Sequence, residues 1–355
     1  MNSFFVVLLV VFSFVSCKKK NKTDETSGAN FEKATLLENV ANNFIIAGYE
    51  DLNTNLTDFE SKYNIFVSNQ TVENFEATRE AWKNTYLQWE NVLMFEFGPA
   101  MDKLLQASLG TFPTDSTKIL TNISAGNYDL LQVSNITAQG LPAFDFLLHR
   151  KDAMGFFSQS NYSNYGLDLI TKMKSDVSAV LASWKTSYSS TFIASTGTES
   201  TSSFSIYVNQ YIKSYEQTKW TKLGIPLGKQ SLDVKQPEFI EARNSAISIA
   251  LLLENIKASQ RLFNGDKKNG TTGIGFDDYL IALDRKELVN TINTSFSQII
   301  ADITAVSSSF ENTMSTNPQV LDAIYTKIHN LTVSLKTDMT SAFGILITYQ
   351  DNDGD

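Results

Sequence analysis

The sequence predicts an all-α protein, and three observations carry this expectation. Apolar residues recur every three or four positions along most of the chain, which is the spacing of one helix face. Only six prolines and 17 glycines interrupt the 355 residues, so long helices can form. Strand-like alternation is rare, and no two β-branched runs flank an Asn-Gly or Asp-Gly turn. We therefore expect two consecutive up-and-down helical bundles, related by pseudo-symmetry.

The chain begins with a segment typical of an export signal. The run Phe4–Val15 is apolar apart from one serine and is too short to span a bilayer, so we expect residues 1–16 to be a signal peptide. The run ends in a small residue followed by Cys17, which resembles the lipobox of bacterial lipoproteins, where the cysteine is lipidated. A plain secretory signal with a chance cysteine is the alternative. Residues 17–30 are polar and without periodicity, which favours a flexible tether.

Lipid chains on Cys17 would anchor the folded part to a membrane. Lys18, Lys19 and Lys20 follow the cysteine in place of an acidic run, and this favours the periplasmic side of the outer membrane over the cell surface. We therefore expect a cell-envelope protein that reaches its membrane through an N-terminal lipid anchor.

Helical spacing divides the rest of the chain into candidate helices. They cover the stripe from Leu36 to Ile45, Leu52–Val67, the stripe from Trp82 to Phe97, Leu141–Leu148, Tyr165–Trp184, Phe204–Leu223, Pro237–Leu262, Phe276–Leu283, Arg285–Ser307 and Val320–Ile347. The segment Ser187–Ser203 is rich in serine and threonine and has no apolar period, so it is predicted to be a hinge. The expected bundles are residues 31–190 and 204–355.

A short internal echo is consistent with two related halves. In the first half, Gly98 stands nine residues after Trp89 of the pair Trp89-Glu90, and a proline follows it. In the second half, Gly224 stands nine residues after Tyr215 of the pair Tyr215-Glu216, and a proline again follows shortly after. Glycine and proline are natural helix endings. Duplication and coincidence explain the echo equally well.

Composition excludes several classes of function. The chain has 29 Lys and Arg against 38 Asp and Glu, a net charge of −9 and a pI near 4.9, so a phosphate backbone would be repelled and nucleic acid is not expected as a partner. One cysteine rules out disulfides within the chain. The two histidines, His149 and His329, form no His-Glu-x-x-His motif, which excludes a thermolysin-like zinc peptidase.

Three segments carry a resemblance to a known family. The first runs from Thr78-Arg79-Glu80-Ala81-Trp82 through Trp89-Glu90 to Phe95-Glu96-Phe97-Gly98-Pro99, the second is Gly140-Leu141-Pro142-Ala143-Phe144-Asp145-Phe146-Leu147-Leu148, and the third is the ending from Phe343 to Asp355. Together they resemble the imelysin family of bacterial periplasmic and envelope proteins. The resemblance implies two helical bundles with a functional site in the cleft between them. Members are described as insulin-cleaving peptidases and as iron-regulated or iron-uptake components.

The chain departs from the hallmark of that family, which is Gly-x-His-x-x-Glu. Gly140 matches, but Pro142 stands at the histidine position and Asp145 at the glutamate position. Leu93 stands where the family commonly has a further glutamate. Binding is therefore favoured over catalysis, because proline cannot supply the general base expected at position 142.

The candidate cleft residues are Gly140, Pro142, Asp145 and Arg243. Gly140 and Pro142 also fit the plain role of starting a helix, since proline is pre-set for the first turn. Asp145 would be favoured there by the helix dipole, but it stands in an apolar run, which favours a partly buried cleft. Arg243, predicted on the helix after Pro237, matches a basic position expected near the family's cleft.

A metal site is a further candidate. Asp145 and His149 are four residues apart, which places them on one helix face, where they could share a metal, with iron as a possible cofactor, or form a carboxylate–imidazole pair. Two ligands do not complete a site, and His149 also fits a solvated helix end.

The sequence therefore predicts an imelysin-like periplasmic lipoprotein that binds a ligand or metal in connection with iron uptake, with other envelope components as possible partners. Two alternatives stay open at this point. One is an envelope metallopeptidase of the imelysin type, and the other is a non-catalytic scaffold.

Overall fold

The computed structural model describes residues 31–349 of the chain. The predicted signal peptide (1–16), the tether (17–30) with its lipidation site Cys17, and residues 350–355 lie outside the described residues. Within residues 31–349 every regular element is helical, which confirms the predicted all-α class.

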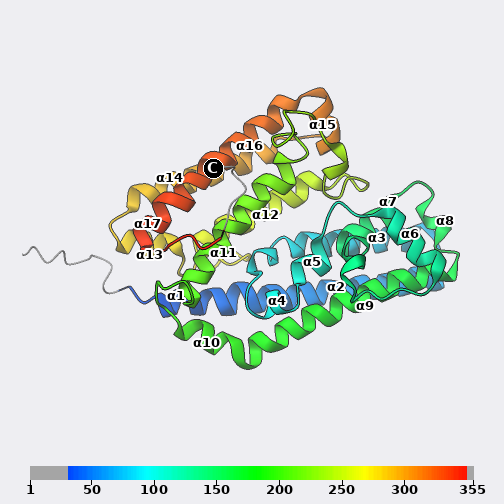
Figure 1. Ribbon diagram of the computed structural model, residues 1–355, viewed down its shortest axis with the longest axis horizontal. Coiled ribbons are helices and arrows are strands. Elements are labelled where there is room, and N and C mark those ends of the chain that lie inside the picture. The colour runs from blue at the N-terminus through cyan, green and yellow to red at the C-terminus, as the bar shows by residue number, and fades with distance from the viewer. Residues whose placement is uncertain (1–30, 350–355) are drawn as a thin grey trace, which may run out of the picture.

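The first group of helices, α1 to α10, covers residues 33–194 and occupies the lower part of Figure 1. Its members are α1 (Lys33–Asn39), η1 (Val40–Ile46), α2 (Ala47–Ser68), α3 (Val72–Trp89), η2 (Leu93–Phe95), α4 (Pro99–Asp102), α5 (Leu105–Gly110), α6 (Ser116–Ala125), η3 (Val133–Ala138), α7 (Gly140–His149), α8 (Ala153–Phe156), α9 (Ser160–Ser183), η4 (Trp184–Tyr188) and α10 (Ser189–Ala194).

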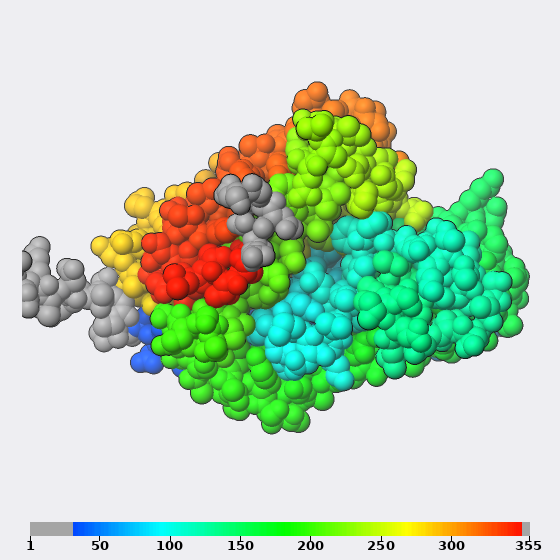
Figure 2. Space-filling view, viewed as in Figure 1, coloured from blue at the N-terminus to red at the C-terminus, as the bar shows by residue number. Residues whose placement is uncertain are grey.

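The second group of helices, α11 to α17, covers residues 203–343 and lies above the first in Figure 1. Its members are α11 (Ser203–Gln217), η5 (Thr218–Gly224), η6 (Pro237–Phe239), α12 (Ser248–Phe263), α13 (Phe276–Ala282), α14 (Lys286–Thr304), α15 (Phe310–Thr316), α16 (Pro318–Val333), η7 (Ser334–Met339) and α17 (Thr340–Phe343). The space-filling view shows the two groups packed against each other (Figure 2).

The predicted hinge Ser187–Ser203 is shorter in the structure. Helix α9 continues through the π-helical turn η4 into α10, so the helix ends only at Ala194. The reason is packing: Phe192 is buried and stacks on Phe97 with ring centroids 5.7 Å apart. Only residues 195–202 separate the last helix of the first group from α11. The predicted limits of two independent bundles, and their duplication, stay predictions.

The predicted helix Pro237–Leu262 is wrong over its first third. Proline starts only the short 3-10 turn η6, residues 240–247 form a non-helical loop, and α12 begins at Ser248. Ala242 and Ala246 have φ angles of 47° and 61°, a left-handed conformation that no helix tolerates. Helix propensity is a weak preference, and tertiary contacts override it here. We call residues 240–247 the cleft loop.

The core of the first group is aromatic. Phe59 of α2 lies edge-on to Phe144 of α7 with ring centroids 4.8 Å apart, and both are fully buried. Tyr63 packs beside them and donates a hydrogen bond from its hydroxyl to the carbonyl oxygen of Ser163 at 2.9 Å. Gly166 leaves room for that hydroxyl, because a Cβ at this position would lie 2.1 Å from it. These contacts fix α7, the hallmark helix, against α2 and α9.

For a passage through the bilayer, a helix must be both long and apolar, and none of the helices between residues 31 and 349 meets both conditions.

Replacing Phe59 by alanine is expected to lower the free energy of unfolding by about 3–5 kcal/mol, because the change leaves a cavity among close-packed rings. Urea denaturation followed by circular dichroism measures it. Ile65→Ala on the same helix is the control, since that side chain is 46% exposed. Equal losses for the two variants would contradict the assignment of this core.

Candidate functional site

A cleft of about 350 Å³ lies where the first group meets the cleft loop. Its walls come from residues 112–116, from the start of α7 and from residues 238–244. Pro142, Asp145 and Arg243 line it, so the structure brings together three of the four residues predicted for a cleft. The rest of the lining combines apolar residues, such as Phe112 and Phe146, with polar ones, such as Ser116 and Glu238.

Gly140, the fourth predicted cleft residue, has a packing role. It has a φ of +78°, which favours glycine, and a Cβ at this position would lie 2.5 Å from the carbonyl oxygen of Leu109. The glycine therefore lets the first turn of α7 lie directly against α5. At the next residue of α7, the carbonyl oxygen of Leu141 accepts a hydrogen bond from the indole nitrogen of Trp82 at 3.0 Å. Pro142 follows within the first turn of α7, as predicted for a helix start.

Asp145 acts as a clamp on the cleft loop. Its side chain is buried, and it accepts three hydrogen bonds: from the backbone nitrogen of Asn244 at 3.0 Å, from the side-chain amide of Asn244 at 2.9 Å and from the backbone nitrogen of Ser245 at 2.9 Å. Both carboxylate oxygens are thereby occupied. A carboxylate that accepts hydrogen bonds from backbone N–H groups is a strong anchor for a turn. The hallmark position thus holds the cleft wall in place.

Arg243 lies in the cleft loop and not on a helix as predicted. Its guanidinium forms a two-point ion pair with Glu311, with nitrogen–oxygen distances of 2.9 and 2.6 Å. About 41% of the arginine side chain is exposed, so the pair is partly solvated.

His149 ends α7 in a half-buried position, not at the fully solvated helix end that was the alternative. Its ring lies 4.8 Å from that of Trp82. Burial lowers the pKa of His149, and the negative charge of Asp145 acts in the opposite direction. Across residues 31–349, no cluster of three or more histidine, cysteine or acidic side chains could hold a metal ion. A metal shared by Asp145 and His149 stays a prediction, and the oxygens of Asp145 are already in use.

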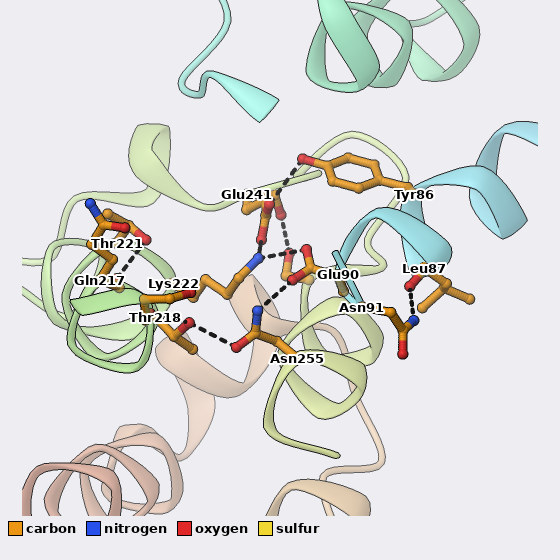
Figure 3. A network of polar contacts seen from close by, with 12 residues as sticks. Tyr86, Leu87, Glu90, Asn91, Gln217, Thr218, Thr221, Lys222, Glu241 and Asn255 are labelled. Atoms are coloured by element: carbon orange, nitrogen blue, oxygen red, sulfur yellow. Dashed lines mark hydrogen bonds and ion pairs between the residues drawn. The ribbon is translucent and has the colours of Figure 1, made fainter. Parts of the chain in front are cut away.

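A buried ion cluster lies directly behind the cleft loop (Figure 3). The ammonium of Lys222 in η5 contacts Oε1 of Glu90 at 2.7 Å and also pairs with Oε2 of Glu241. The exposed fractions of these side chains are 6% for Lys222, 0% for Glu90 and 4% for Glu241. Tyr86 donates a hydrogen bond to Glu241 at 2.9 Å, and Asn255 of α12 donates one to Glu90 at 2.9 Å. We call these five side chains the ion cluster.

Burial dominates the electrostatics of the ion cluster. It raises the pKa of Glu90 to about 8, with Lys222 acting in the opposite direction. Burial alone would lower the pKa of Lys222, but Glu241 and Glu90 more than offset it and hold that pKa above its ordinary value. The pKa of Tyr86 lies far above its usual range, first because of burial and then because of Glu241. Lys222 is therefore charged at physiological pH.

The sequence contained a signal for this cluster that the sequence-based prediction did not use. Glu90 follows Tyr86 by four residues and so lies on the apolar stripe of its helix, and Lys222 similarly follows the apolar face that contains Tyr215. A charged residue on an apolar face is buried only when it is paired. No local sequence pattern indicated that Glu241 belongs to the ion cluster, because its position depends on the non-helical path of the cleft loop.

A model of the imelysin family matches residues 45–337. The chain belongs to the imelysin family. Two solved structures share its fold, each with a TM-score of 0.73 and 16% sequence identity. One is an imelysin-like protein from Psychrobacter arcticum 273-4, in which the alignment covers 90% of this chain and 97% of that chain. The other is a putative iron-regulated protein A precursor from Parabacteroides distasonis ATCC 8503, with 88% and 96% covered. No curated protein matched the sequence.

Within the imelysin hallmark of this chain, each residue has a structural explanation. Gly140 allows close packing, Pro142 lies in the first turn of α7, and Asp145 anchors the cleft loop. The hallmark segment borders a cleft, but its own side chains are engaged with the protein.

Asp145→Ala is expected to lower the free energy of unfolding by about 2–4 kcal/mol, because it leaves buried N–H groups of the cleft loop without their acceptor. Chemical denaturation measures the change. Asp58→Ala, at an exposed position of α2, is the matched control and should change stability by less than about 0.5 kcal/mol. If the two variants are equally stable, Asp145 is not a clamp.

Lys222→Met is expected to lower the free energy of unfolding by about 3–5 kcal/mol, because it leaves the buried acids Glu90 and Glu241 without the cation that they share. Lys327→Met removes a half-exposed ion pair with Asp302 and should cost less than about 1 kcal/mol. Thermal and urea unfolding of both variants give the comparison. A loss below about 1 kcal/mol for Lys222→Met would show that the ion cluster does not contribute to stability.

Proposed function

We propose that this imelysin-family protein is an exported, lipid-anchored protein of the cell envelope whose cleft holds a ligand, without cleaving it, in the course of iron acquisition. The observation that carries the proposal is the state of the hallmark residues in the cleft. Pro142 offers no base or metal ligand, and both oxygens of Asp145 are hydrogen-bonded to the cleft loop.

The donor set of the cleft does not suit a bare metal ion. Hard cations such as Fe(III) and Mg²⁺ require several oxygen ligands. Two carboxylates line the cleft, and because that of Asp145 is already hydrogen-bonded to the cleft loop, only that of Glu238 is left. The cleft is large enough for a small organic molecule or an iron complex, and its walls combine apolar side chains with an arginine that can exchange its partner. We therefore infer that iron, where it is involved, is bound as a chelate.

The link to iron and to export is supported by a structural relative. That protein carries the description of an iron-regulated precursor, and the two chains share a fold over most of their lengths. For the present chain, the lipobox-like sequence at Cys17 and the apolar run before it support export and lipid anchoring. Periplasmic placement and other iron-uptake components as partners are part of the same proposal.

Calorimetry with ferric citrate tests the binding site. Wild-type protein should bind with an affinity in the micromolar range or tighter, and Ser116→Trp should weaken binding at least tenfold, because Ser116 lines the cleft and the indole would fill it. Ser160→Trp is the matched control, since both serines are the first residue of a helix and Ser160 is exposed. Citrate without iron shows whether the metal is needed.

Three outcomes would contradict the proposal. Ser116→Trp with unchanged affinity would place the ligand elsewhere, and no binding of ferric citrate would remove the chelate as a ligand. Cleavage of a peptide library by the wild-type protein, lost in the Asp145→Ala variant, would favour the peptidase alternative.

A further inference from the structure

The ion cluster contains more acid than base. Two buried carboxylates, Glu90 and Glu241, share one ammonium, that of Lys222, and the remaining neighbours in the ion cluster are the neutral groups of Tyr86 and Asn255 (Figure 3). With both acids ionised, the cluster carries one excess negative charge out of contact with water. With one proton bound, its charges balance. Burying an unbalanced charge is unfavourable, so the balanced form is the stable one.

Burial favours Glu90 over Glu241 as the acid that takes up this proton, because Glu90 has an exposed fraction of 0% and Glu241 of 4%. Glu90 is the fully buried member, and it faces charged or titratable groups from each neighbouring element: Lys222 of η5, Glu241 of the cleft loop and Tyr86 of its own helix. From α12 it faces only the amide of Asn255. Burial raises its pKa to about 8, so the proton is exchanged close to neutral pH.

The ion cluster is also mechanically connected to the cleft. Glu241 lies between Ile240 and Ala242, which both line the cleft, so the position of its carboxylate fixes that wall. The ammonium of Lys222 also lies 5.9 Å from the ring centre of Phe112, another residue that lines the cleft. A change of charge behind the wall therefore acts on the cleft itself.

We propose that the ion cluster is a proton-sensitive latch: protonated Glu90 holds the cleft loop closed against the first group of helices, and loss of this proton loosens the loop. The latch acts on the cleft described above, so its consequence for ligand binding rests on the proposed function. Deprotonation places two like charges, on Glu90 and Glu241, on opposite sides of the contact between α3 and the cleft loop. The loop yields because it is non-helical and contains left-handed alanines at 242 and 246.

The sign of the pH dependence follows from the raised pKa. A carboxyl group that binds its proton more tightly in the folded state stabilises that state fully at low pH. This contribution is lost as the pH rises from the ordinary value of 4.5 through about 8. We therefore expect the cleft loop to be closed in mildly acidic to neutral conditions and looser above pH 8.

Hydrogen exchange read by mass spectrometry tests the latch on the full-length protein without ligand. After correction for intrinsic exchange rates, the protection of amides 240–247 should fall at least tenfold between pH 6 and pH 9. Glu90→Gln, which cannot ionise, should keep its protection at both pH values. Glu216→Gln is the matched control and should behave like the wild type, because Glu216 is also a buried carboxylate paired with a lysine, and its partners Lys336 and Tyr349 lie outside the cleft loop.

A second measurement covers the case in which a variant does not fold. In wild-type protein labelled with ¹³C at the glutamate carboxyl carbons, one resonance should titrate near pH 8, well apart from those of exposed glutamates. Constant protection of residues 240–247 across this range, or the same loss of protection in Glu90→Gln, would overturn the proposal. Because no ligand is added, a failure of ferric citrate to bind, with the exchange pattern intact, would contradict the proposed function and leave the latch standing.

Discussion

The contacts of the Lys222 ammonium with Glu90 and Glu241 are the interaction on which the arrangement of this molecule depends. They connect α3 in the first group of helices to η5 and the cleft loop in the second, at a place that water does not reach. Charges removed from water are tolerated only in good geometry with their remaining hydrogen bonds satisfied, and Tyr86 and Asn255 provide these. The two groups of helices are thereby held in a defined relative position, and the cleft is a consequence of that position.

The cleft loop forms one wall of the cleft with an unfavourable backbone conformation. Its left-handed alanines cost energy, and the loop persists because carboxylates hold it at two places, with Glu241 fixed by the ion cluster and residues 244–245 fixed by Asp145. The carboxylate of Asp145 therefore accepts hydrogen bonds from the backbone of the cleft loop. A longer acidic side chain without these hydrogen bonds could face a ligand. Membership of the imelysin family sets the fold.

The contact between the two groups of helices is polar in other places as well. Asn39 donates hydrogen bonds to the carbonyl oxygens of Gly265 and Ile274, Arg261 donates one to Asn91, and Lys268 donates one to Gln88. Polar contacts of this kind give less stability than an apolar interface of equal size, but they define one relative orientation. A change in the protonation of one buried group can alter such an interface, whereas an apolar core would be insensitive to pH.

The sequence by itself determined the helical class, the family and the segments that reach the cleft, because helical periodicity and the hallmark spacing are local properties of the chain. The apolar stripe that begins at Trp82 is one such local pattern, and Trp82 and Trp89 on it are both buried. The tertiary structure decided the path of residues 240–247, the occupation of Asp145 and the convergence of Glu90, Lys222 and Glu241. These depend on contacts between residues far apart in the chain, such as Asp145 with Asn244, 99 positions apart, and Glu90 with Lys222, 132 positions apart. No local pattern encodes which buried charge meets which.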